Sequence, residues 1–157
     1  AARPGAGRGP RGGGVLRAAV SRPAGEPEAL PALRAEVDDV LRVTAGDPGA
    51  AAVAGLADVH ARVLLARVAD ELARRPELRH PAVAAMVAHD REHRTEYARS
   101  VAAWLDAVGS VAAAAQRLGV HPNTLKYRLR RAGQLFGLDL EHPDDRLSAW
   151  LQLRLAL

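Results

Sequence analysis

Apolar and polar residues alternate at helical spacing between Ser110 and Phe136, and a glycine divides this pattern into two parts. In the first part the apolar residues recur every three or four positions, as on one face of a short helix. Ser110 suits the start of this helix because its hydroxyl can accept a backbone N–H, and Gly119 suits its end because glycine adopts a left-handed turn without strain. Pro122 then suits the first turn of a second helix. The stretch therefore predicts a helix-turn-helix.

The second helix, at about residues 122–135, has two chemically different sides. One side is apolar and predicts packing into a core; its members are Leu125, Leu129, Ala132 and Phe136. The other side carries hydrogen-bond donors and cations, which suit the base edges and phosphates of a DNA major groove. Residues 110–136 hold five basic residues and no acidic one. This pattern predicts DNA binding through the second helix.

Each polar residue of this helix has an expected role. The residues expected nearest the base edges are Asn123, Thr124, Lys126 and Tyr127. Those expected at phosphates are His121, Arg128, Arg130 and Arg131. Arg128 lies closest to the apolar side, so a second interpretation makes it the partner of an acidic residue in the same domain. Basic helices also occur as plain solvated surfaces. The alternative function is therefore a helical protein-interaction or oligomerisation module without specific DNA binding.

The two helices resemble a known family. The runs that carry the resemblance are Ala114-Ala115, LGVHPNTL at residues 118–125 and YRLRR at residues 127–131. They are similar to the C-terminal DNA-binding domain of PucR-type bacterial transcriptional regulators, a family named for the control of purine catabolism. The similarity extends over Leu78–Leu157, and it implies a sequence-specific regulator whose partner is double-stranded DNA. The chain departs from the residues usual in the family at Lys126, Ala132 and Gly133.

Helical and turn patterns cover most of the remaining chain. They predict a strand at Val15–Ser21, helices at Glu28–Val43 and Leu56–Ala73, and a turn at Gly46–Gly49. Residues 81–89 and 95–108 form one broken or continuous helix. Its apolar residues are spaced to pack on the motif: Tyr97, Val101, Trp104, Leu105 and Val108. Pro143 opens a last helix, whose apolar residues are expected to close the core: Leu147, Trp150, Leu151 and Leu155.

These elements predict an all-α fold with three parts. Residues 1–25 are rich in glycine, proline and arginine and are expected to be flexible. Residues 26–77 form helices that, by the family resemblance, look like the tail of a diguanylate-cyclase-like middle domain and its connector. The pattern of a working cyclase is absent. Residues 78–157 form the helix-turn-helix domain. The apolar side of the Leu56–Ala73 helix has few partners within the chain, which favours a homodimer.

Composition narrows the class of protein further. The formal net charge is +4, and the positive charge lies mainly in residues 1–25 and 110–136, which favours an acidic partner such as nucleic acid. The absence of cysteine excludes disulfides, thiol nucleophiles and cysteine-ligated zinc. No apolar run approaches a membrane span and no signal-peptide pattern is present, so a cytoplasmic protein without membrane contact is expected. A small-molecule effector is expected only through a domain upstream of this chain.

One further motif has catalytic potential. The run His89-Asp90-Arg91-Glu92-His93 matches the pattern of inverted zinc peptidases, in which two histidines one helical turn apart hold zinc and a glutamate activates water. A catalytic site needs a third protein ligand, and no residue downstream forms a recognisable one. We therefore expect a solvated, partly capping segment of the lead-in helix here, no metal or other cofactor, and no enzymatic activity.

Overall fold

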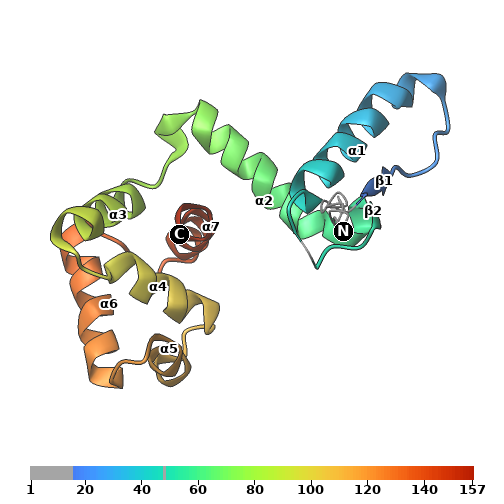
Figure 1. Cartoon of the computed structure of the whole chain (residues 1–157). Helices are drawn as coiled ribbons and strands as arrows, with labels where there is room; N and C mark the ends of the chain where they lie inside the picture. The colour runs from blue at the N-terminus through green and yellow to red at the C-terminus, as the bar shows by residue number, and fades with distance from the viewer. Residues whose placement is uncertain (1–15, 48) are drawn as a thin grey trace, which may run out of the picture. The chain divides into compact units, whose positions relative to one another are not determined.

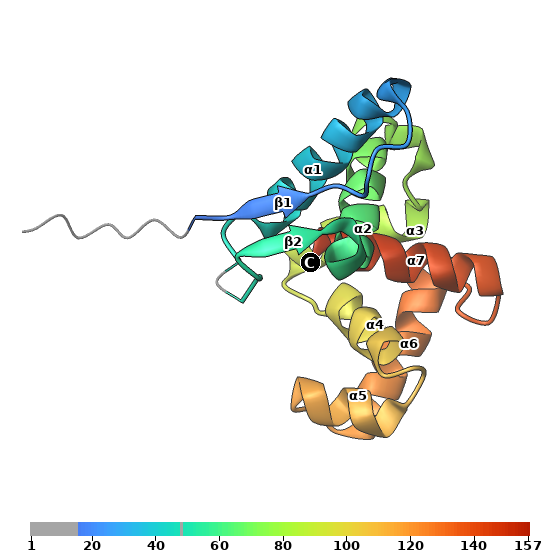
Figure 2. The same cartoon turned by 90° about the vertical axis from the view of Figure 1, so that its right-hand side faces the viewer.

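The computed structural model describes residues 16–47 and 49–157, and Figures 1 and 2 show its elements. The chain divides into two compact units, Ala1–Ala66 and Arg67–Leu157. Most of the segment predicted to be flexible, residues 1–25, lies outside the described residues. Within the described part of the chain, no helix has both the length and the apolar character needed to cross a membrane.

The first unit contains a short pair of parallel strands. β1 (Ala18–Val20) pairs with β2 (Val53–Gly55). Parallel strands need a long connection between them. Here it contains a 3-10 turn (Pro27–Ala29) and α1 (Leu30–Thr44). Figure 2 shows α1 beside the two strands. The predicted strand and helix are present, and β2 went unpredicted because a run of three residues carries too little pattern to identify a strand.

α1 and the elements after it supply the core of this unit. Leu33 and Val40 of α1 are buried, and so is Ala54 of β2. α2 (Leu56–Arg74) begins directly after β2, and Val63 on its first half is buried as well. Hydrophobic packing therefore holds α1 next to the strand pair.

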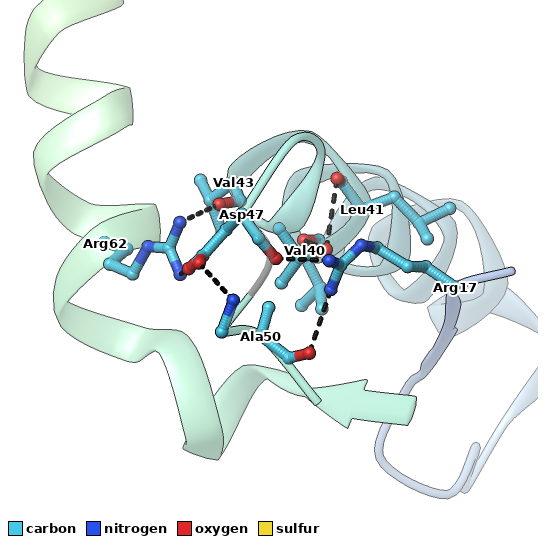
Figure 3. Close-up of polar contacts among 9 residues, drawn as sticks. Arg17, Val40, Leu41, Val43, Asp47, Ala50 and Arg62 are labelled. Carbon is cyan, nitrogen blue, oxygen red and sulfur yellow. Dashed lines mark hydrogen bonds and ion pairs between the residues drawn. The ribbon is translucent and has the colours of Figure 1, made fainter. Parts of the chain in front are cut away.

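Asp47 is the centre of a polar cluster that closes the loop after α1, and Figure 3 shows its contacts. One carboxylate oxygen accepts the backbone N–H of Gly49 at 2.9 Å, and the other accepts from Nη1 of Arg62 at 2.7 Å. Arg62 also donates to the carbonyl of Val43. Arg17 donates to the carbonyls of Asp47 and Ala50, so it ties the segment before β1 to the segment before β2.

The second unit is entirely helical. After the second half of α2 come a 3-10 turn (Pro76–Leu78), α3 (Pro81–His93) and α4 (Tyr97–Asp106). They are followed by α5 (Val111–Leu118), α6 (Pro122–Phe136) and α7 (Pro143–Ala156). The prediction of one broken or continuous helix over residues 81–108 resolves into two helices, because Arg94 takes a left-handed backbone with φ of 54°. The predicted all-α class is confirmed for this domain.

Two apolar clusters lie within this unit. The larger one joins α3, α4, α6 and α7; its fully buried side chains are Met86, Val101, Ala132, Ala149 and Leu153. The smaller one lies between α5 and α6 and contains Ala114, Ala115 and Leu125. Trp104 and Leu129 contact both clusters. Because these two residues are shared, the packing of α4 and the packing of the helix-turn-helix are coupled.

The predicted core residues of α7 were partly wrong. Leu147 is 64% exposed and Trp150 is 38% exposed, while Ala149 and Leu153 are fully buried. The small side chain of Ala149 lets α7 approach the cluster on that face, and the indole N–H of Trp150 instead donates to Asp106 at 2.8 Å. The spacing of apolar residues in α7 did not identify its buried side, because large apolar residues lie on more than one side of this helix.

The prediction that Val108 packs on the motif was also wrong, because its side chain is 90% exposed. It lies in the turn that ends α4, where Gly109 N–H donates to the carbonyl of Trp104 and Val108 N–H to that of Leu105. The turn after α5 has the same pair of bonds and puts Gly119 in the left-handed position. Val108 occupies that position with φ of 52°, which strains a β-branched residue.

We predict that Val108→Gly raises the free energy of unfolding by about 1 kcal/mol, because relief of the left-handed strain exceeds the added flexibility of the unfolded chain. Little burial is lost, since the side chain is exposed. Urea denaturation of the whole chain measures the change. The matched control is Gly119→Ala, which introduces strain at the equivalent position, where a Cβ has open space, and lowers stability by about 1 kcal/mol. A stabilising Gly119→Ala would contradict the argument.

Asp47 predicts how the first unit responds to acid. The backbone N–H of Gly49, and then the guanidinium of Arg62, hold the pKa of its carboxyl below the ordinary value. A lowered pKa in the folded state means that the stabilisation is complete above the ordinary aspartate pKa and is lost as the pH falls through the folded value. Asp47→Asn should therefore destabilise the unit at neutral pH, and the difference from the unchanged protein should shrink as the pH falls below about 4.

Thermal unfolding at neutral and acidic pH, followed by a signal from the first unit, tests this expectation. Asp38→Asn is the matched control, because among the described residues Asp38 makes a long, exposed contact of 3.9 Å to Arg34 and no other, and such pairs contribute little. Equal effects of the two substitutions at neutral pH would contradict the role given to Asp47.

Candidate nucleic-acid interface

Local signals fix the corner between α5 and α6. Ser110 Oγ accepts the backbone N–H of Ala113 at 3.3 Å and so caps the start of α5. Gly119 ends α5 in a left-handed turn with φ of 66°. Val120 then packs against the small cluster between the two helices. The predicted helix-turn-helix is present, with α6 as its second helix.

α6 exposes the side that was expected to face DNA. Leu125 and Ala132 are fully buried, and Leu129 and Phe136 are half-buried, so the apolar side packs inward as predicted. The exposed polar side chains are Asn123, Thr124, Lys126, Tyr127, Arg130, Arg131 and Gln134. Within the described residues, Lys126, Arg130 and Arg131 form no ion pair, so their charges are available to an anionic partner.

His121 has a structural role that the sequence did not reveal. Its Nδ1 accepts the backbone N–H of Asn123 at 3.2 Å and caps the start of α6. A neutral ring that accepts at Nδ1 carries its proton on Nε2. The capping interaction therefore leaves one N–H of His121 as a donor at the end of the helix where the backbone dipole is positive. Histidine is not among the preferred capping residues, so no sequence signal indicates this role.

Arg128 differs from the other basic residues of α6 because an acidic residue holds it. Its Nη1 lies 2.8 Å from Oε2 of Glu96 and donates to Oγ of Ser100 at 3.4 Å. Ser100 is fully buried, and the Arg128 side chain is 25% exposed. This is the contact that the second interpretation of Arg128 described.

Arg130 and Tyr127 form a pair on the exposed side of α6. The guanidinium carbon of Arg130 lies 6.0 Å from the centre of the Tyr127 ring, and the tyrosine side chain is 52% exposed. A cation over an aromatic face is weakly attractive at this distance. The pair limits the positions open to the arginine and presents two donors side by side.

The residues of the zinc-peptidase pattern make other contacts. Asp90 caps α4: its carboxylate accepts the backbone N–H groups of Tyr97 at 3.0 Å and Ala98 at 2.7 Å, and the hydroxyl of Thr95 at 2.5 Å. His89 bonds Thr95 through Nδ1 and stacks on His93, with ring centres 4.2 Å apart. These contacts join α3 to α4, so the expected capping role is present in Asp90.

His89 also reaches the end of α6. Its ring meets that of Phe136 edge-on at 5.4 Å between centres, and Tyr97 meets Phe136 in the same way at 5.9 Å. The lead-in helices α3 and α4 therefore hold the C-terminal end of α6. Asp90 precedes the first residue of α4 by seven positions, which is too far for a standard capping pattern to reveal.

Residues 97–155, from the first residue of α4 to the last turn of α7, match the family model described as the PucR C-terminal helix-turn-helix domain. This segment is therefore similar to PucR-type helix-turn-helix domains. The resemblance seen in the sequence of the two helices is thereby confirmed for residues 97–155. Residues 78–96, which the sequence resemblance included, lie outside the matched range.

Two curated relatives are similar to the chain. The DNA-binding transcriptional activator AdeR of Bacillus subtilis (strain 168) is 30% identical over 67 residues, which is 43% of this chain and 16% of that protein. The carbohydrate diacid regulator of Escherichia coli (strain K12) is 44% identical over 57 residues, which is 36% of this chain and 15% of that protein. The matched part of the chain thus spans about one-sixth of the relatives' length. No solved structure gives a significant match.

Proposed function

We propose that this chain is the DNA-binding part of a transcriptional regulator and recognises specific sequences in double-stranded DNA. The observation that carries the proposal is the exposed side of α6, which presents amide, hydroxyl and cationic donors without an acidic side chain, in a PucR-type domain. The two relatives, which are a transcriptional activator and a regulator, support it. The chain itself is proposed to have no catalytic role.

The proposed contacts follow from the positions on α6. Asn123, Thr124, Lys126 and Tyr127 read base edges in the major groove, where an amide pairs well with adenine and a cation with guanine. His121, Arg130 and Arg131 contact phosphates, through the free ring N–H of the histidine and two guanidinium groups that form no ion pair with any described residue. Arg128 is left out of this set because Glu96 holds it.

The proposal includes a homodimer in the cytoplasm. On α2, Leu64 is 55% exposed, and Leu65, Val68 and Leu72 are only half-buried. A second copy of the chain could cover this apolar side. A dimer would recognise two half-sites, and their spacing on DNA would report the distance between the two recognition helices.

The affinity of the chain for DNA should fall as the salt concentration rises. About three phosphate contacts give a plot of log K against log salt concentration with a slope of about −3. Fluorescence anisotropy of the whole chain, with a randomised duplex pool and with the sequences selected from it, measures this slope. A selected duplex should bind about tenfold or more tightly than the random pool. A flat salt response, or no binding at low salt, would instead support a helical module that binds another protein.

The second prediction separates base readers from phosphate contacts. Asn123→Ala and Tyr127→Ala should weaken binding to the selected duplex by about fivefold or more and change binding to random DNA much less. Arg131→Ala should weaken both by a similar factor, because a phosphate contact carries no sequence information. All three side chains are exposed, so the variants should unfold at nearly the same temperature as the unchanged protein. Equal losses for the three variants would remove the assignment of base readers.

A further inference from the structure

A pair of charged residues on the edge of α6 holds the recognition helix against α4. We propose that Glu96 and Arg128 are positioning residues that set the rotation of α6 about its own axis, and thereby the sequence selectivity of the domain. This inference rests on the proposed DNA recognition. It gives Glu96, whose charge DNA repels, a favourable role in binding the correct sequence.

Glu96 can serve α6 because another residue caps its own helix. Glu96 precedes Tyr97, the first residue of α4, where a side chain usually bonds the orphan backbone N–H groups. Asp90 takes those N–H groups instead. The carboxylate of Glu96 is therefore free to reach α6, where Oε2 lies 2.8 Å from Nη1 of Arg128. Its other oxygen, Oε1, lies 3.3 Å from Nη1 of Arg99.

Arg128 contacts two residues that lie at different positions along the axis of α4. Glu96 precedes the first turn of α4, and Ser100 lies one turn further along with no exposed surface. The same guanidinium nitrogen is 2.8 Å from the first and 3.4 Å from the second. Two contacts on one neighbouring helix constrain the direction of the arginine better than one contact does. The arginine side chain is only 25% exposed, so solvent competes weakly for it.

Because of its position on α6, the contact that Arg128 makes with α4 limits rotation of α6 about its own axis. It follows the buried Leu125 by three positions and precedes the buried Ala132 by four, so it lies at the edge of the packed side. Thr124 and Arg131 lie one turn before and one turn after it, on the same edge of the helix. A rotation of α6 that followed loss of the pair would move both residues relative to the groove, together with the base readers next to them.

The two possible roles of Arg128 predict opposite effects of one substitution. If Arg128 bound phosphate, Glu96→Gln would release it and remove a repelling charge, so every DNA would bind more tightly. If the pair positions α6, Glu96→Gln weakens binding to the selected duplex about fivefold or more, and binding to random DNA stays equal or becomes slightly tighter. The ratio of the two affinities therefore falls.

The experiment uses the whole chain in three forms: unchanged, Glu96→Gln and Arg99→Gln. Arg99→Gln is the matched control because Arg99 bonds the same carboxylate but lies on α4 and is 66% exposed; it should keep the affinity ratio. Partly exposed pairs contribute little to stability, and thermal unfolding confirms that each variant is folded at the temperature of the titration. Affinity of Glu96→Gln for the selected duplex equal to or above that of the unchanged protein overturns the proposal.

Arg128→Gln gives an independent measurement through salt. A positioning residue leaves the slope of log K against log salt unchanged on random DNA, whereas loss of a phosphate contact reduces its magnitude by about 0.9. A reduced slope overturns the proposal. If the unchanged protein selects no duplex, the proposed DNA recognition has failed before the role of Glu96 and Arg128 is tested.

Discussion

The packing of α4 against α3, α5, α6 and α7 is the constraint on which the rest of the domain depends. Trp104 on this helix contacts both apolar clusters, so neither cluster can shift without the other. At the C-terminal end of α4, Asp106 accepts the indole N–H of Trp150 and pairs with Arg154 at 3.3 Å. At its N-terminal end, Asp90 supplies the cap. The orientation of α6 therefore depends on its packing against α4.

The parts of the domain that the sequence predicts well are those with local causes. The start of α5 at Ser110, its end at Gly119 and the start of α6 at Pro122 each depend on one residue and its near neighbours. The inward side of α6 follows from spacing alone, because the helix has a single apolar side. The buried side of α7 could not be deduced in the same way. Ala149 and Leu153 are buried and Leu147 is not, because burial here depends on the shape of the cluster against which α7 packs.

In the candidate site, too, features with local causes could be predicted and features that depend on tertiary contacts could not. Exposure of Asn123, Tyr127 and Arg131 follows from their positions on α6. The partner of Arg128 could not be deduced, because Glu96 lies 32 residues away in the sequence and meets it only through the contact between α4 and α6. A capping role for the segment around Asp90 was expected, but its target could not be deduced because Asp90 lies seven residues before the start of α4. The cap that His121 provides could not be deduced because histidine is not a usual capping residue. A sequence pattern predicts which side chains lie on each side of a helix, whereas the partners of those side chains depend on the tertiary fold.

The small cluster between α5 and α6 has a consequence for the dynamics of the domain. It buries two alanines and one leucine completely, whereas the cluster around α4 and α7 buries several larger side chains. Regions with little buried apolar area open at lower free energy than the core that surrounds them. The backbone amides of α5 should therefore exchange with solvent faster than those of α4. A partner that lies along α6 would slow that exchange, so recognition would also complete the folding of the part of the domain that touches the partner.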